Sequence, residues 1–267
     1  MKLKMGQLTR QKQKKRKKMQ NFLGKNDFVW FFGVVEDRND PLQLGRLRVR
    51  AYGWHTEDKN KISTESLPWA IPLQTITSAA VSGKGTSPTG ILEGSWVIGF
   101  FADGDEAKEP YIMGSFAGIP QFKADKEKGF NDPNGVYPTY VDESDVNKLS
   151  RGTNTISKTP DPNTGEPPTA YQAKYPYNHV TETESGHVIE VDDTPDYERL
   201  HIYHKSGTFI EVHPTGEVVI QQKNGFRTVT GNDNIHVTGD MTILVDGNFK
   251  VQATGNVDID GKRIDLN

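Results

Sequence analysis

Residues 231–261 read "GNDNIHVTGDMTILVDGNFKVQATGNVDIDG", with a glycine at every eighth position and Asn or Asp after each one up to Gly255. Apart from Leu244, apolar and polar side chains alternate between these glycines. A period of two is typical of strands that bury one face and leave the other in water. A glycine followed by Asn or Asp favours a corner with φ above zero. A regular repeat of strand and corner predicts a β-solenoid, and we call these eight-residue repeats the octads.

The shortness of the octad segment predicts association between chains. Four octads make only about one and a third turns of a three-sided coil. One chain alone would leave its apolar stripe and both strand edges exposed, whereas three intertwined chains would pair every strand around a shared apolar axis. The predicted core of this trimer is Ile235, Val237, Met241, Ile243, Val245, Phe249, Val251, Val257 and Ile259. The predicted corners are Gly231, Gly239, Gly247 and Gly255. A meander packed on the rest of the chain is the alternative.

The composition indicates a β-rich, turn-rich protein. The chain has 267 residues with 26 Gly and 15 Pro, and 34% of it is hydrophobic, which leaves room for two domains with modest cores. It has no cysteine, so disulfides and cysteine metal sites are excluded. No apolar run approaches the roughly 18 residues that span a bilayer, and no signal peptide is visible. We therefore expect a soluble protein made in a cytoplasm.

The net charge of −3 conceals a strong asymmetry. Residues 1–18 carry nine Lys or Arg and no acid, which leaves −12 for the remainder. A block of like charges is typical of a solvated arm that can touch nucleic acid or an acidic protein surface. We predict a basic disordered arm over residues 1–25, and its partner stays open.

The fold predicted for the whole chain is all-β. Residues 26–141 hold strand-like runs at 28–35 and 46–52 and in "LPWAIPLQ", "GSWVIGFFA" and "PYIMGSFAG". Five short strands without helical periodicity favour a small closed barrel, for which the oligonucleotide/oligosaccharide-binding (OB) fold is the simplest candidate.

The region after the barrel first loses and then regains strand character. Residues 142–174 are polar and without periodicity, which predicts a linker. Residues 175–230 return to strands that lead into the octads of 231–267. The strand runs expected there are 188–191, 200–204, 208–212 and 217–221.

Two motifs suggest binding chemistry that the spacing does not support. "SGKGTSPTG" (82–90) lacks the first glycine of a phosphate-binding loop, since position 78 is Ser, and is expected to be a barrel loop. His201 and His204 lie three apart on a predicted strand and therefore point to opposite faces. With His213 nearby and His236 facing outward, the sequence predicts no metal site.

A third motif resembles an active site. Asp192, Asp193, Thr194 and Pro195 form an ordinary turn sequence, and Glu198 and Arg199 can pair across neighbouring strands or chains. We expect structural roles for these residues.

Long co-linear segments resemble one family. "FFGVVEDRNDPLQLGRLRVRAYGWH", "LPWAIPLQTITSAAVSGKGTSPTG" and "GFNDPNGVYP" are similar to the N-terminal OB domain of the central spike proteins of T-even-type contractile-tailed phages. "YPYNHVTETESGHVIEVDDTPDYERLHIYHKSGTFIEVHPTG" resembles the strands that lead into their trimeric β-helix, and "IDGKRIDLN" the end of their needle. The spikes of type VI secretion systems share the second pattern. The resemblance implies an OB barrel joined by a linker to an intertwined trimeric β-helix.

The resemblance also implies partners and a role. Such a spike sits in the virion at the tip of the tail tube, after assembly in the host cytoplasm. Its OB domains pack on a trimeric hub protein, a further protein caps the C-terminal tip, and sheath contraction drives it through the host envelope. No cofactor or dedicated nucleic acid is implied.

The chain departs from the best-known family members, which carry a lysozyme domain between barrel and helix. Here that interval is residues 142–174, too short for a glycosidase. Its acids, namely Asp142, Glu143, Asp145, Asp161 and Glu166, have no visible scaffold. We expect no enzymatic activity. Two alternatives stay open: an OB protein that binds nucleic acid through Trp30, Phe31, Phe32 and Tyr52 with its basic arm, and a spike that still degrades peptidoglycan.

Overall fold

A computed structural model describes residues 28–156 and 165–265. The predicted basic arm of residues 1–25 lies outside the described residues. The chain divides into two compact units, the first ending at Lys223 and the second beginning at Asn224. No helix in the described part of the chain has the length and apolarity that crossing a membrane requires.

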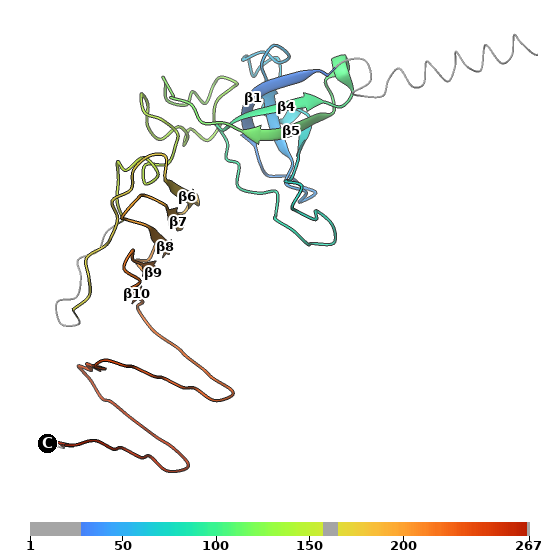
Figure 1. Ribbon diagram of the computed structural model, residues 1–267. Helices are drawn as coiled ribbons and strands as arrows, with labels where there is room; N and C mark the ends of the chain where they lie inside the picture. The colour runs from blue at the N-terminus through green and yellow to red at the C-terminus, as the bar shows by residue number, and fades with distance from the viewer. Residues whose placement is uncertain (1–27, 157–164, 266–267) are drawn as a thin grey trace, which may run out of the picture. The chain divides into compact units, whose positions relative to one another are not determined.

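The first sheet is a closed five-stranded barrel, as predicted (Figure 1). Its strands follow the order β1-β2-β3-β5-β4, and β3 and β5 are the parallel pair. Two short 3-10 turns, η1 (Thr64–Ser66) and η2 (Gly104–Glu106), precede β3 and β5. The strands are β1 (Trp30–Asp37), β2 (Leu47–Ala51), β3 (Trp69–Pro72), β4 (Trp96–Phe101) and β5 (Pro110–Ser115).

Every second side chain along the strands points inward and fills the barrel interior. On β4, Val97 and Phe101 are buried with Gly99 between them, and Phe31 of β1 packs against Phe101 with ring centroids 4.6 Å apart. Gly99 is required there because a Cβ atom would lie 2.0 Å from the carbonyl oxygen of Tyr111. Each buried aliphatic or aromatic side chain contributes about 1.5–3 kcal/mol to stability.

A buried ion pair, which the sequence did not predict, ties two long loops to the barrel. The guanidinium of Arg50 donates to both carboxylate oxygens of Glu36, at 2.6 and 3.1 Å, and both side chains are fully buried. Arg50 also donates to the carbonyls of Thr56 (2.7 Å) and Ile62 (2.9 Å). Glu36 accepts from the backbone N–H of Phe130 at 2.8 Å. The pair therefore holds the loop after β2 and the segment around Phe130 in place.

The second sheet is an antiparallel meander of one chain, in the order β10-β9-β8-β7-β6. Four of its strands lie where the sequence predicted strands, and the fifth, β6, precedes them. An intertwined β-helix is not observed in this single chain. The strands are β6 (Asn178–Glu182), β7 (Val188–Asp192), β8 (Arg199–Tyr203), β9 (Phe209–Val212) and β10 (Val218–Gln221).

The predicted linker has no strand, yet its described parts are packed. Leu149 is buried, and Arg151 donates to Glu143 at 2.6 Å. Asp145 accepts from the backbone N–H of Gly118 at 3.1 Å, which connects the segment to the end of the barrel. The expectation that these acids lack a scaffold was therefore wrong for Glu143 and Asp145, because neighbouring basic and N–H groups hold them.

The second unit, described by itself, is an extended chain with regular bends. The chain bends at 230–231, 238–239, 246–247 and 254–255, each time at an octad glycine, and runs straight between them. None of these four glycines has a positive φ, so the expectation of left-handed corners was wrong for the single chain. No atom lies within 4 Å of a Cβ placed on any of these glycines, so the bends are not tight turns that would need a left-handed backbone.

Replacement of Arg50 by Met is expected to destabilise the barrel by about 3–5 kcal/mol, because Glu36 would stay buried without its cation. All four tryptophans lie at positions 30–96, so their fluorescence during urea unfolding reports on the barrel. Lys61→Met, which removes the exposed Lys61–Asp58 pair, is the matched control and should change stability by less than about 1 kcal/mol. Equal effects of the two substitutions would contradict a structural role for the buried pair.

Candidate functional site

The β6–β10 sheet buries a charged face and exposes an apolar one. Glu190 of β7 lies directly opposite His201 of β8, which in turn lies opposite Glu211 of β9. These three residues and Arg199 are at most 3% exposed. Buried charges persist only where they are paired and hydrogen-bonded, so the contacts of this face decide the stability of the sheet.

The buried charged and polar side chains form one connected set across four strands, which we call the ionic row: Asn178, Glu190, Arg199, His201 and Glu211. Arg199 lies between two acids, with Nη2 2.7 Å from Glu190 Oε2 and Nη1 3.4 Å from Glu211 Oε1. Nδ1 of His201 lies 3.0 Å from Glu190 Oε1, and Asn178 donates its amide to Glu190 Oε2 at 2.8 Å. Each member thus contacts a neighbouring strand.

Residues 165–174, which we call the strap, cover the ionic row. Thr169 donates its hydroxyl to Glu211 Oε1 at 2.8 Å, and the N–H of Ala170 donates to the same oxygen at 3.2 Å. The guanidinium of Arg199 lies 4.9 Å from the centre of the Tyr171 ring, within the range of a cation–π contact. The strap is part of the segment predicted as a linker, and its polar composition serves these contacts.

The surroundings shift two pKa values on this face. Burial opposes ionisation of Glu190, but the hydrogen bond from His201 and the charge of Arg199 outweigh it and hold the pKa of Glu190 below its ordinary value. Burial, followed by the negative charge of Glu190, raises the pKa of Tyr171 to about 12. Glu190 is therefore ionised and Tyr171 neutral throughout the physiological range.

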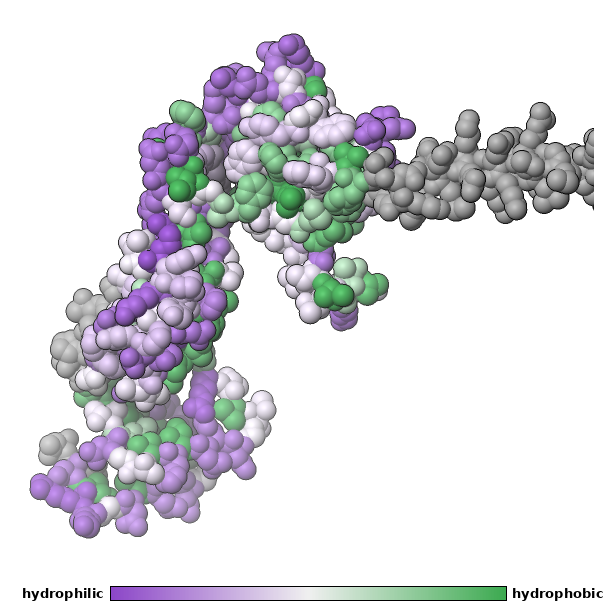
Figure 2. All heavy atoms as spheres, turned by 45° about the horizontal axis from the view of Figure 1, so that its top comes forward, coloured by the Kyte–Doolittle hydropathy of each residue, from purple (hydrophilic) through white to green (hydrophobic). Residues whose placement is uncertain are grey.

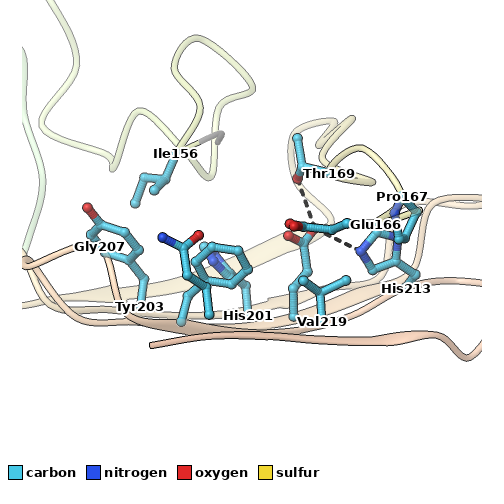
Figure 3. Close-up of a pocket in the computed structure, with 12 residues that line it drawn as sticks. Ile156, Glu166, Pro167, Thr169, His201, Tyr203, Gly207, His213 and Val219 are labelled. Carbon is cyan, nitrogen blue, oxygen red and sulfur yellow. Dashed lines mark hydrogen bonds and ion pairs between the residues drawn. The ribbon is translucent and has the colours of Figure 1, made fainter. Parts of the chain in front are cut away.

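A cavity of about 190 Å³ lies between the strap and the sheet (Figure 3). Glu166 and Thr169 line it from the strap, and His201, Glu211 and His213 line it from the sheet. Nε2 of His213 lies 3.8 Å from the Glu211 oxygen that Thr169 and Ala170 already contact. In the described ranges, no three His, Cys, Asp or Glu side chains converge in a way that could hold a metal ion. The Glu211 carboxylate thus holds the strap.

The structure places the predicted histidines on different faces, as expected. His201 is buried, whereas His204 is exposed and its ring Nδ1 lies 2.7 Å from Ser206 Oγ. His236 is exposed in the second unit. Residues 82–90 lie in the loop between β3 and β4, so their prediction as a barrel loop is confirmed.

Two residues of the turn motif, Asp192 and Arg199, have the structural roles predicted for them, and the predicted pairing of Glu198 stays a prediction. Asp192 accepts from the N–H of Thr194 at 3.0 Å, and Arg199 pairs across strands with Glu190 and Glu211. Sequence reasoning missed both of these acids. The signal that could have found them is the matching phase of Glu190, His201 and Glu211 on three successive predicted strands.

The other face of the sheet carries apolar side chains that the described residues of the first unit leave exposed. They lie on β7, β8, β9 and β10 and are 42–60% exposed. Monomeric soluble proteins rarely expose an apolar sheet face of this kind, so it indicates an interaction surface. This apolar face consists of Ile189, Val191, Leu200, Ile202, Ile210, Val218 and Ile220.

A second apolar surface lies on the outside of the barrel. Trp30, Phe32, Tyr52, Trp96 and Phe116 follow one another with ring centroids 5.5–6.0 Å apart, and we call them the aromatic stripe. The neighbouring Phe31 points inward and belongs to the core. Figure 2 shows apolar residues open to the surface on the barrel and elsewhere in the molecule.

Comparison with known proteins identifies the family. The family model of the Gp5 N-terminal OB domain matches residues 52–199, just over half of the chain. The chain belongs to the Gp5 family. Protein Gp5 of Vibrio phage KVP40 is 38% identical over 286 aligned positions, which cover 88% of this chain and 68% of that protein. The pre-baseplate central spike protein Gp5 of Enterobacteria phage T4 is 45% identical over 132 positions, 48% of this chain and 23% of the T4 protein.

The Gp5 match extends past the barrel. It ends at Arg199 and so includes the strap, β6 and β7. The ionic row therefore begins within the matched region and continues beyond it, through His201 and Glu211.

Acid is expected to release the strap. Since the pKa of Glu190 is lowered in the folded state, its contribution to stability is present above its unfolded pKa of about 4.3 and is lost as the pH falls through the lower, folded value. Hydrogen exchange of strap peptides, measured by mass spectrometry, should show greater protection in the wild type than in Glu190→Gln at pH 7. That advantage should shrink towards pH 3. The two proteins are compared at equal pH, so the intrinsic exchange rate cancels. A difference in protection that does not depend on pH would contradict a stabilising role for ionised Glu190.

Proposed function

We propose that this chain is the structural central spike of a contractile phage tail baseplate, a homotrimer that is driven through the host envelope when the sheath contracts. The observation that carries this proposal is the exposed apolar face of the β6–β10 sheet, followed in sequence by octads with an alternating apolar stripe. Membership of the Gp5 family supports it, because the T4 relative is named as a pre-baseplate central spike protein.

The apolar side chains favour three chains around one axis. The nine predicted core residues of the octads, from Ile235 to Ile259, are 46–72% exposed in the single chain. Residues 231–265, the described part of the octad segment, form no strand ladder within one chain, which leaves their backbone N–H and C=O groups open to other copies. An intertwined trimeric β-helix over residues 231–267 would cover the stripe and pair these groups, with the glycines at its corners.

The domain plan of the spike follows from this proposal. Residues 26–141 are the OB domain, 142–174 connect it to the strands of 175–230, and 231–267 are the needle. The OB domains dock on a trimeric hub protein, and the aromatic stripe gives the barrel an apolar surface for such a contact. A capping protein binds the C-terminal tip. The spike acts in the virion, after assembly in the host cytoplasm.

The spike is proposed to act without catalysis or a cofactor. Glu143 is engaged by Arg151 and Lys148, and Asp145 accepts from a backbone N–H. These carboxylates hold the connecting segment to its surroundings. Clearing of a peptidoglycan zymogram by the purified protein would contradict this part of the proposal.

One observation favours a second function. Exposed aromatic side chains on an OB barrel can stack on the bases of single-stranded nucleic acid. The chain beyond residues 1–18 is strongly acidic, however, and nucleic-acid binding would leave the octads unexplained. Tight binding of single-stranded DNA that persists without residues 1–18 would favour this alternative.

The native mass of the full chain tests the trimer. Light scattering should give three times the chain mass of 29.8 kDa, and the species should survive SDS without boiling. Ile202→Asp places a charge on the apolar face and should yield monomers, because three carboxylates would be buried close together. Lys205→Asp, in the exposed turn after β8, is the matched control and should leave the trimer intact. A monomeric wild type would overturn the spike proposal.

A further inference from the structure

We propose that the ionic row, closed by the strap, sets the strand register of the β6–β10 sheet. It thereby decides which face is sealed within each chain and which is presented to other copies. The register claim concerns one chain alone, and only its consequence for assembly rests on the proposed trimer.

The apolar face cannot set the register by itself. Ile189 lies opposite Ile202, which lies opposite Ile210, and their neighbours on the same face are Val191 and Leu200. A slip of two residues keeps every side chain on its own face and merely exchanges one branched aliphatic contact for another. Such exchanges change packing little, so several registers would have similar free energies.

The ionic row distinguishes between these registers because its contacts are paired and buried. Arg199 contacts Glu190 on β7 and Glu211 on β9 at the same time, while His201 contacts Glu190. If β7 slips by two residues so that Val191 lies opposite Ile202, Glu190 moves to a position opposite Tyr203, away from both His201 and Arg199. That slipped sheet would hold the buried Glu190 without its cation, whereas in the opposite slip Glu190 stays beside Arg199 and only His201 loses it.

The strap extends this control across the sheet. Its Thr169 and Ala170 contact Glu211 on β9, Tyr171 lies over Arg199 on β8, and the N–H of Lys174 donates to Thr194, just after β7, at 3.0 Å. Three strands are thus held at fixed positions along one continuous segment. The same contacts seal the charged face, so that only the apolar face is left for association.

Engineered cysteine pairs in the full-length protein can test the register, since the chain has no cysteine of its own. The pair I189C/I202C reports the native register, and V191C/I202C reports the slip of two residues that moves Glu190 opposite Tyr203. Each pair is placed in three backgrounds: wild type, a neutral-row variant (E190Q, R199M, E211Q), and a control that removes exposed charges (E198Q, K205M). Intrachain disulfides are counted after mild oxidation as the cross-linked fraction that keeps the mass of one chain.

In the wild-type and control backgrounds, the native pair should oxidise about tenfold faster than the slipped pair, because only its Cα spacing suits a disulfide. In the neutral-row background the two rates should approach each other, and protection of strap amides from hydrogen exchange should be lost. An unchanged preference for the native pair in the neutral-row variant would overturn the proposal.

Two further readouts keep the test decisive. If circular dichroism shows that the neutral-row variant does not fold, Thr169→Val replaces it. This substitution removes the hydroxyl that donates to Glu211 and accepts from the N–H of Tyr171, and it should still lower the preference for the native pair. Light scattering of the same samples reports the trimer separately. A monomeric wild type with a strong register preference would overturn the proposed function alone, whereas a trimer without any such preference would overturn the register proposal alone.

Discussion

The position of Arg199 between Glu190 and Glu211 is the constraint on which the second half of the molecule depends. A guanidinium can contact two carboxylates at once because its donors form a planar fork. Once this group is buried, each acid needs it, and the strap must cover all three. The sheet therefore has a charged interior within one chain. Most of its aliphatic side chains are left on the outer face, which reverses the usual arrangement of a sheet in a monomeric protein.

The barrel pairs its strand edges and buries its apolar side chains differently from the second sheet. It closes on itself, so no strand edge is left unpaired, and its apolar side chains fill the interior. Its buried pair, Glu36 and Arg50, secures loops and not strands. The barrel is thus complete within one chain. The open sheet and the described octads leave apolar side chains and backbone groups uncovered within their own units, as the proposed trimer requires.

The sequence was sufficient to predict whatever depends on local alternation. The five barrel strands and four strands of the second sheet follow from period-two patterns, and the barrel fold from their number and spacing. The ionic row could not be predicted, because it depends on the register between strands and on a strap that is about 40 residues away from Glu211 in the sequence. A polar segment such as 165–174 resembles a linker until its hydrogen-bond acceptors are known. The missed residues were therefore those whose partners are distant.

The octads show why a short repeat of this kind implies a closed assembly. A strand with two free edges and an apolar stripe can add further copies without limit, and the result is a fibre. Closure around an axis limits this growth, because each chain then pairs its strand edges with those of its two neighbours. With eight residues between corners, every side of such a coil has the same length, so three equal sides close without strain. If the sheet before the octads has one fixed register in each chain, the octads of all three chains would begin at the same height along the axis. That condition is what an intertwined needle needs if each apolar side chain is to meet its counterparts on the axis.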